Sequence, residues 1–408
     1  LPCLALHCLA LPCLYNTFEI INFLVASRMM NKRFEALDAF RGICALSVVL
    51  YHMNVLGSVT ELDFFNNSSI FVEFFFVLSG FVLAHGYGSK ENLNFNTFMK
   101  ARFFRLYPLH FFMFLVFVIL EFGKLFAYKF GGFVFNNEPF TNSAAVSEMI
   151  PNLLLIHSWT PFTENISFNG PSWSISIEFY MYALLYISIV LFKSNRIISW
   201  FAISFTAFLL MYLGSEILVS SVLRGLSCFF GGAFTYVMYK KLSHFKPSYI
   251  LGSIVETLLL ILVVLIVQST FEYRSIIAPV LFFFTVLFFA FECGIFSQLL
   301  KIKPLQYAGK LSYSIYMTHY AILFCLLSTA MVLQKITGIE MAPMIETIRF
   351  LNFGGAMINN LVVIVILAIV IYISSLTYKY IEIKGQKLNK KVGADSSTEQ
   401  TRISATRS

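Results

Sequence analysis

Ionisable side chains inside apolar segments are the residues of this sequence that could do chemistry. The segment LDAFRGICALSVVLYHMN contains Arg41 and His52, eleven residues apart. In a helix they would share one face, with about 16 Å between them along the axis. Because ionisable groups are costly at membrane depth, each is a functional candidate. The alternative is that Asp38 pairs with Arg41 at i,i+3 and that His52 only bonds a neighbouring helix.

Two acidic residues lie in other apolar segments, at a predicted depth near that of His52. Glu73 lies in SIFVEFFFVLSGFVLAHGYG and Glu178 in PSWSISIEFYMY. A carboxylate beside an imidazole orients the neutral base and stabilises its charged form. We therefore predict that His52 is a catalytic base and that Glu178 orients its ring. The alternative, hydrogen bonding between helices, fits Glu73 better than Glu178.

Two arginines precede the third apolar segment, in KARFFRLYPLH. Arg102 and Arg105 are spaced i,i+3 and face the same way if the segment is helical. Their planar guanidinium groups suit phosphate oxygens, which predicts a binding site for a phosphate-bearing cofactor. The alternative is a basic anchor that contacts lipid headgroups.

Four further residues are predicted to bind substrate. Arg224 is placed in the outer part of the sixth apolar segment and His319 in the inner part of the ninth, within GKLSYSIYMTHY. Trp173 is expected about 7 Å above Glu178 in the same helix, where its ring could stack on a ring of the substrate. Glu73 completes this set. Each of the buried polar residues might instead only hold helices together.

The elements that must position these residues are membrane-spanning helices. The chain of 408 residues is 58% hydrophobic and 12% charged, and its apolar residues fall in long runs rather than alternating. A run of about twenty apolar residues is what a helix needs to cross a bilayer. We predict an all-α polytopic membrane bundle of about ten transmembrane helices. The spans lie near 38–58, 68–87, 107–130, 173–192, 197–213, 217–239, 249–268, 275–297, 311–334 and 353–378.

Basic residues predict the orientation of these spans. The net charge of +8 comes from residues in short loops that form no continuous basic face, so nucleic acid is not an expected partner. Basic residues gather in alternate loops, which are expected to be cytoplasmic. With this orientation both termini are cytoplasmic. The cysteines show no zinc-ligand spacing, and no metal site is predicted.

The domain boundaries follow from composition. Residues 30–384 are expected to form the membrane domain, and residues 385–408 a disordered cytoplasmic tail. Residues 1–28 contain crude repeats of a leucine- and cysteine-rich motif, and we interpret them as an extension outside the native protein. The segment 131–172 has no Lys or Arg but several aromatic residues, which predicts an ordered external cap.

Taken together, these motifs resemble the acyltransferase-3 family of integral membrane O-acyltransferases over about residues 34 to 383. The resemblance rests on LDAFRGICALSVVLYHMN, VEFFFVLSGFVLA, ARFFRLYP, PSWSISIEFYMY and LSYSIYMTHY, which occur in the family's order. It implies that Arg41 and His52 are the family's essential pair. It also implies that Arg102 and Arg105 recognise acyl-CoA and that Glu178 is the acid of the Trp-Ser motif.

The resemblance implies transfer of an acyl group, acetyl by expectation, from cytosolic acetyl-CoA to a hydroxyl of a cell-surface or lipid-linked glycan such as lipopolysaccharide. The expected location is a bacterial inner membrane. The chain departs from the family at Phe179, Tyr180 and Ile383, where other residues are frequent. Acceptor modification is expected to be completed by the membrane domain or by a separate partner.

The rival interpretation is a transporter or flippase without acyl-transfer activity. Buried charges in a polytopic protein would also suit a substrate pathway. The sequence shows no internal inverted repeat of the kind many transporters have, which favours the enzyme.

Overall fold

The computed structural model describes residues 32–389, except for residues 91, 134, 136, 246 and 347. Residues 1–28, interpreted as an extension, lie outside the described part, as does the tail beyond residue 389. Ten helices of at least sixteen residues occur in the described part, and each overlaps one predicted span. They are α2 (Glu35–Tyr51), α4 (Phe71–Tyr87), α5 (Phe95–Gly131), α7 (Ser172–Phe192), α8 (Arg196–Tyr212), α9 (Ser220–Lys241), α10 (Tyr249–Gln268), α11 (Arg274–Phe289), α13 (Lys303–Thr337) and α14 (Ala356–Thr377).

Shorter elements connect the long helices. They are α3 (Asp63–Asn66), α6 (Met149–Leu153), α12 (Ile295–Leu299) and the antiparallel strands β1 (Met344–Ile345) and β2 (Ile348–Arg349). Leu351, after the β-hairpin, bonds through its backbone to Asn54 and Leu56. The hairpin is therefore tied to the segment that follows α2.

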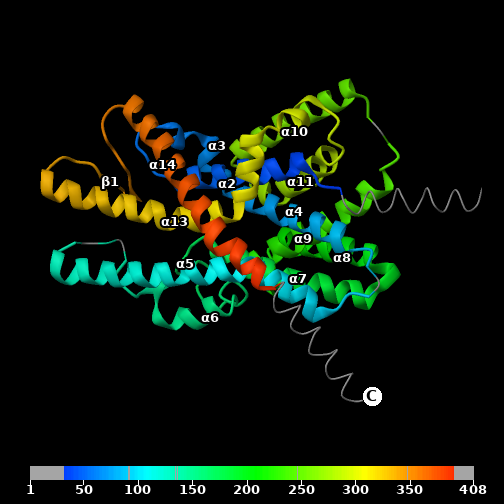
Figure 1. Ribbon diagram of the computed structural model, residues 1–408, viewed down its shortest axis with the longest axis horizontal. Helices are drawn as coiled ribbons and strands as arrows, with labels where there is room; N and C mark the ends of the chain where they lie inside the picture. Colours follow the sequence, from blue (N-terminus) through cyan, green and yellow to red (C-terminus); the bar gives the residue numbers. More distant parts are fainter. Residues whose placement is uncertain are drawn as a thin grey trace, which may run out of the picture.

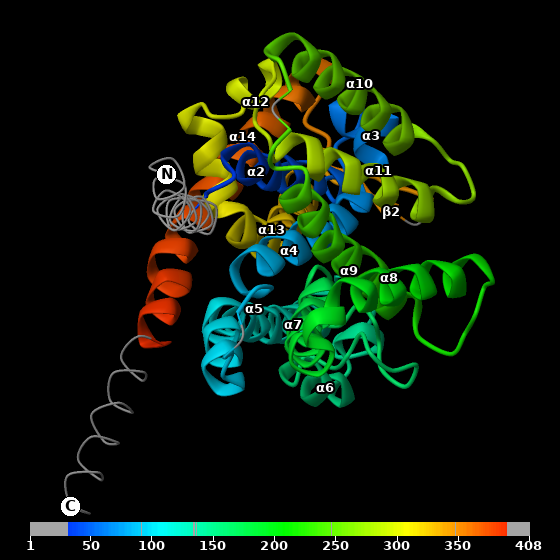
Figure 2. The same cartoon turned by 90° about the vertical axis from the view of Figure 1, so that its right-hand side faces the viewer.

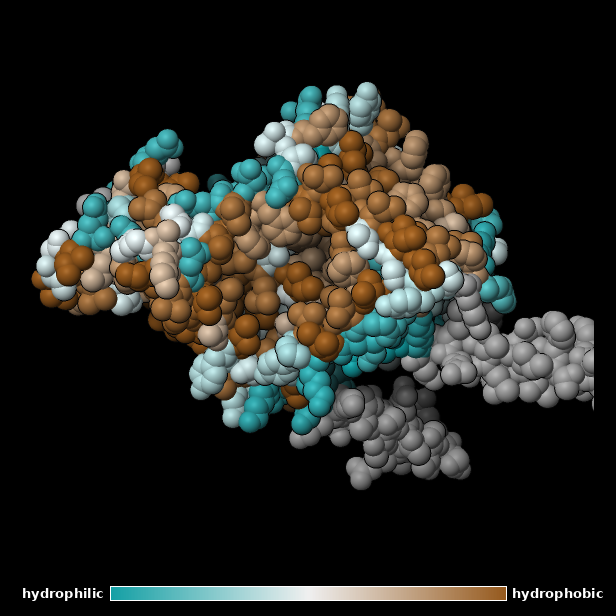
Figure 3. Space-filling model, turned by 90° about the horizontal axis from the view of Figure 1, so that it is seen from above, coloured by the Kyte–Doolittle hydropathy of each residue, from teal (hydrophilic) through white to brown (hydrophobic). Residues whose placement is uncertain are grey.

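Most of the long helices in the described residues have the length and apolarity of membrane spans. Six helical stretches of 20 to 41 residues are long and apolar enough to cross a bilayer, and one of them joins α7 to α8. The face seen in Figure 3 is largely apolar, with hydrophilic residues gathered in separate patches. Such a surface suits lipid rather than water. The prediction of an all-α polytopic membrane bundle is confirmed.

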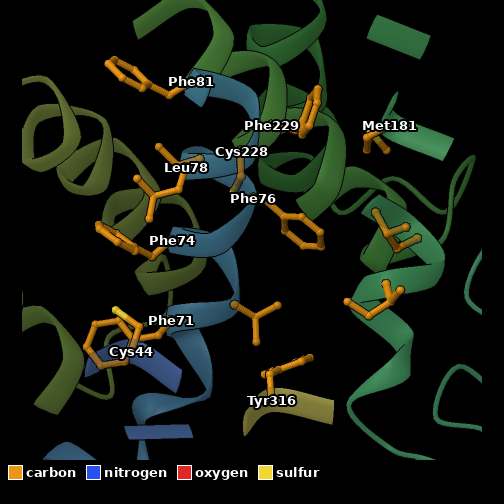
Figure 4. Close-up of a cluster of buried hydrophobic side chains, with 14 of the residues drawn as sticks. Cys44, Phe71, Phe74, Phe76, Leu78, Phe81, Met181, Cys228, Phe229 and Tyr316 are labelled. Carbon is orange, nitrogen blue, oxygen red and sulfur yellow. The ribbon is translucent and has the colours of Figure 1, made fainter. Parts of the chain in front are cut away.

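The helices form two groups that meet at α4 and α9. In Figure 2, α2, α10, α11, α13 and α14 lie on one side, and α5, α7 and α8 lie on the other. Figure 4 shows side chains leaving α4 in different directions, with Phe74, Phe76 and Phe81 among them. All three rings are buried. The helix α4 thus runs through the middle of the core.

Small residues allow the central helices to approach closely. A methyl group at Gly80 of α4 would overlap the carbonyl of Phe229 in α9, and one at Gly232 would overlap that of Val77. Close backbone approach at small residues is the usual way in which helices pack in membranes, where no water drives them together. These contacts fix α4 against α9.

Close backbone contacts at glycines also set the register of α2 against α13. A methyl group at Gly309 of α13 would overlap the carbonyl of Asp38, and one at Gly42 of α2 would crowd the Gly309 nitrogen. Both helices run in the same direction, and His52 and His319 each follow their glycine by ten residues. Parallel helices keep this register, so the glycine contact brings the two histidines to one level.

Several helix ends differ from the predicted spans. The helix α2 ends at Tyr51 rather than near residue 58, because the chain turns before Gly57, whose φ of 62° is left-handed. The helix α5 begins at Phe95, where the Asn94 side chain accepts a bond from Thr97. After α14, a π-helical turn at Tyr378–Glu382 leads into further helix up to residue 389, where a disordered tail was predicted from residue 385.

Candidate active site

Two histidines meet where α2 ends. His52 is the residue that caps α2, and its Nδ1 lies 3.1 Å from Nε2 of His319 in the middle of α13. The imidazole of His319 is fully buried, whereas that of His52 is partly open. His319 was predicted in the inner part of its span, and its contact with His52 was not predicted. The helix α13 begins at Lys303, eight residues before the hydropathy window, so that His319 lies farther along the helix.

The hydrogen bonds of this pair assign its protons. His319 Nδ1 lies 3.2 Å from the Ile315 carbonyl, which can only accept, so this nitrogen carries the hydrogen. In neutral His319 the other nitrogen, Nε2, is then an acceptor, and the donor to it is His52 Nδ1, which also lies 3.1 Å from the Val48 carbonyl. The proton positions are assigned from these hydrogen-bond partners. This assignment leaves Nε2 of His52 without a proton and able to act as a base.

His52 faces a cavity of about 370 Å³, which we call the His52 chamber. Its walls come from the C-terminal halves of α5 and α13, the segments after α2 and α5, and the β2 strand. Its polar lining consists of His52, Asn54, Lys124, Asn137, Tyr320, Ser328 and Arg349. The ring of Tyr320 packs edge-on against that of His52, with centroids 5.4 Å apart. The chamber therefore offers space for a substrate hydroxyl beside the free nitrogen of His52.

Glu178 does not belong to this histidine site. Its Oε1 accepts hydrogen bonds from the hydroxyls of Ser79 and Tyr182. It lines a separate small cavity together with Arg41. The prediction that Glu178 orients His52 is therefore wrong in this structure, where the ring is held by Val48 and His319. Glu178 and His52 were predicted at a similar depth, but they lie at different positions around the bundle.

The carboxylate of Glu178 is instead part of a buried arginine cluster. We use this name for Arg41, Arg102, Arg105, Glu178 and Glu382, which interact electrostatically with one another. Asp38, the alternative partner of Arg41, forms its ion pair with Arg33 at 2.6 Å. Three arginines face two carboxylates in the cluster, so it has one positive charge in excess.

Arg102 and Arg105 lie in the first turns of α5 and turn into the protein. Arg102 Nη2 donates to the Tyr87 hydroxyl at 3.3 Å, and its guanidinium lies 5.5 Å from the centre of that ring. Its Nε is buried and has no hydrogen-bond partner among the described residues. This inward geometry favours a ligand site over the alternative of a headgroup anchor.

Glu382 is a member of the cluster that the sequence analysis did not single out. It lies in the π-helical turn after α14, it is buried, and its Oε2 accepts from Ser314 at 3.0 Å. A π-helical turn often accompanies a functional site, but the sequence does not reveal where such a turn forms. The only other hint was an acidic residue in the closing segment TYKYIEIKGQK.

A line of polar side chains on α13 joins the two sites. Ser312, Tyr316 and His319 recur on one face of the helix at the spacing i, i+4 and i+7. Ser312 and Tyr316 line the small cavity beside Arg41, and His319 contacts His52. We call this line the α13 stripe. It places polar side chains between the arginine cluster and the His52 chamber, and we call this arrangement the polar path.

Glu73 and Arg224 form a third group. Glu73 Oε1 lies 2.7 Å from Arg224 Nε and 2.6 Å from Nη2, which joins α4 to α9. The Arg224 guanidinium also lies 4.7 Å from the centre of the Trp173 ring. Pairing between helices, the alternative considered for Glu73, is what the structure shows. The arginine covers one face of Trp173, where a ring of the substrate was expected to stack.

Within the segment 131–172, residues 137–172 fold back onto the bundle. Asn169 donates to the Met317 carbonyl at 3.0 Å, and Trp159 donates to the Ser176 carbonyl at 3.0 Å. His157 is fully buried in this segment and lies 3.3 Å from the Ser172 hydroxyl. Burial lowers the pKa of His157 to about 3, so the ring is neutral at pH 7.

No group of three or more potential metal ligands occurs in the described residues. The fold and the buried polar sites together define the chain as a polytopic helical membrane protein with two internal polar sites. A family model for an acyltransferase domain matches residues 34–379. The chain therefore belongs to the acyltransferase-3 family, as its motifs predicted.

Named relatives agree with this family. The chain is 35% identical to acyltransferase MdmB of Streptomyces mycarofaciens over 34% of its own length and 30% of the relative's. It is 26% identical to the putative peptidoglycan O-acetyltransferase YrhL of Bacillus subtilis, over 72% of its length and 49% of the relative's. It is 24% identical to O-acetyltransferase OatA of Staphylococcus aureus, over 72% of its length and 52% of the relative's. The chain thus spans about half the length of these last two relatives. No solved structure matches it.

Proposed function

We propose that this protein transfers an acetyl group from cytosolic acetyl-CoA to a hydroxyl of a cell-surface or lipid-linked glycan. The observation that carries the proposal is the polar path from a positively charged cluster to a histidine with a free basic nitrogen. The family and the names of its relatives, two of which are O-acetyltransferases, support the same chemistry.

The donor would bind at the arginine cluster. Acetyl-CoA carries phosphates at one end, and the excess positive charge and the unpartnered Nε of Arg102 suit them. In our proposed orientation this end of the bundle faces the cytosol, both termini are cytoplasmic, and the protein lies in a bacterial plasma membrane. The thioester arm would then follow the α13 stripe past Arg41.

The transfer would take place at the His52 chamber. His52 Nε2 accepts the proton of the acceptor hydroxyl while the hydroxyl oxygen attacks the thioester carbonyl. The carbon–sulfur bond breaks, and the leaving thiolate takes the proton from the imidazolium. His319 holds the ring in the required tautomer, which is the role first predicted for Glu178. A neutral buried histidine suits this role because it adds no charge beside the developing imidazolium.

The proposal is tested with the purified protein in lipid nanodiscs. We expect release of free CoA thiol and transfer of labelled acetyl from acetyl-CoA to a glycan acceptor, both lost in His52→Ala. A transporter or flippase would move substrate across liposome membranes without consuming acetyl-CoA. That result would favour the rival interpretation and contradict the proposed enzymatic activity.

The orientation has its own test. A cysteine introduced at 140–165, in a background whose native cysteines are replaced, should react with a membrane-impermeant reagent on intact cells. A cysteine at 300–305 should react only after permeabilisation. The opposite labelling pattern would place the arginine cluster on the outer side and remove the cytosolic donor site.

A further inference from the structure

An apolar groove opens beside the His52 chamber. It has a volume of about 300 Å³ and runs between the last turns of α5 and α13, which lie side by side in Figure 1. The chamber and the groove are adjacent, because they share part of their lining. The shared residues are Lys124, Phe135, Phe324, Ser328 and Met331.

The groove is open on the outer surface of the bundle. Of its lining residues, Gly123 on α5 and Cys325 and Val332 on α13 are exposed. In a membrane these residues would contact acyl chains, because water does not reach them there. A hydrocarbon chain could thus enter the groove laterally from the bilayer while its headgroup reaches His52.

The chamber carries a cation, Arg349, that pairs with no carboxylate in the described part of the chain. Lys124 Nζ lies 3.3 Å from Glu121, whose other oxygen accepts from the Phe140 backbone, so Lys124 is largely compensated. Arg349 donates to the Ala342 carbonyl at 3.1 Å and forms no ion pair within the described residues. The guanidinium of Arg349 is therefore available to an anionic group of a ligand.

From this arrangement we infer that the acceptor is a lipid-linked saccharide whose sugar is joined through phosphate to a long hydrocarbon chain. The inference rests on the proposed function and names its acceptor class. The chain occupies the groove, the phosphate meets Arg349, and the sugar hydroxyl lies beside His52 Nε2. Together the groove and chamber have the volume of an ordinary small-ligand site.

Gly123 allows the groove to be filled selectively. It lines the groove on α5, and a Cβ at this position would meet nothing within 4 Å. Gly123→Phe should therefore occupy the groove without disturbing the helix. Gly86 of α4 is also exposed with open space at its Cβ and lies outside the groove, so Gly86→Phe is a matched control.

Three acceptor probes separate chain, phosphate and sugar. They are farnesyl-phosphate-linked N-acetylglucosamine, neutral farnesyl N-acetylglucosaminide and free N-acetylglucosamine. Gly123→Phe should raise KM at least about tenfold for both farnesyl acceptors, and Arg349→Gln should do so only for the phosphate-linked one. Arg349→Lys should recover part of that loss. Gly86→Phe should behave as the wild type does.

Binding without the donor gives a readout that does not depend on transfer. A fluorescent farnesyl phosphate should bind the wild type and Gly86→Phe, and at least about tenfold more weakly to Gly123→Phe and Arg349→Gln. Equal binding to all variants, or equal transfer to all three acceptors, would overturn the inference while leaving acetyl transfer standing. Tight, groove-dependent binding without any acetyl transfer would instead contradict the proposed function and support the lipid site.

Discussion

The two ends of the polar path hold their ionisable groups in opposite ways. The arginine cluster keeps three cations near two carboxylates and surrounds them with tyrosines such as Tyr182. The His52 chamber instead pairs two histidines through one shared hydrogen bond of 3.1 Å. A charged cluster with excess positive charge suits binding of an anion, whereas a neutral base suits proton transfer. The comparison separates binding from chemistry within one bundle.

The largest expected effect is at the chemical end. His52→Ala should lower the acetyl-transfer rate by about 10² to 10⁴ while KM for acetyl-CoA stays near the wild-type value, because a general base is lost and the donor site is kept. Rates with purified protein over a range of donor concentrations measure this. Transfer at a near-normal rate would return His52 to a packing role.

At the binding end, charge reversal should act on donor affinity. Arg102→Glu with Arg105→Glu should raise KM for acetyl-CoA about 100-fold, since hydrogen bonds to charged groups contribute more than neutral ones. Lys100→Glu is the matched control, because Lys100 is exposed on the same turn of α5. Gel filtration in detergent checks that the double variant is folded. Unchanged donor kinetics in a folded double variant would support the headgroup anchor.

His319 tests whether the histidine pair works as a unit. His319→Ala should lower the transfer rate about tenfold, a smaller loss than that of His52→Ala, because the ring of His52 keeps its bond to Val48. His319→Gln, which can still accept from His52 Nδ1, should recover part of this loss. A Glu178→Gln variant measured beside them should change donor binding instead. A change only in rate for Glu178→Gln would restore its predicted link to His52.

The last prediction concerns the stability of the cap rather than the rate of transfer. The pKa of His157 is about 3 in the folded protein against about 6.5 when unfolded, so the unfolded state binds more protons between these values. Stability should thus fall as pH drops below about 6.5, by about 2 kcal/mol at pH 5 for this residue. Thermal unfolding at pH 7 and pH 5 should show a smaller difference in His157→Gln. An identical difference in both proteins would contradict this assignment.

Composition and hydropathy determined the class of this protein. A chain with so many apolar runs of span length has few stable solutions other than a helical membrane bundle, and ten described helices overlap the ten predicted spans. Motif order likewise predicted the family. The i,i+3 spacing predicted that Arg102 and Arg105 face the same way, because local helical geometry needs no tertiary information.

Only the tertiary structure decided which polar residues meet. Depth along a span can be estimated from sequence, but the angular position of each helix depends on close contacts such as Gly42 with Gly309. Those contacts placed His319, rather than Glu178, beside His52. Burial of Glu382 in the arginine cluster depends on a π-turn that returns the end of α14 to the bundle. Helix packing and local irregularity are properties of several segments at once, so no single motif in the sequence could predict them.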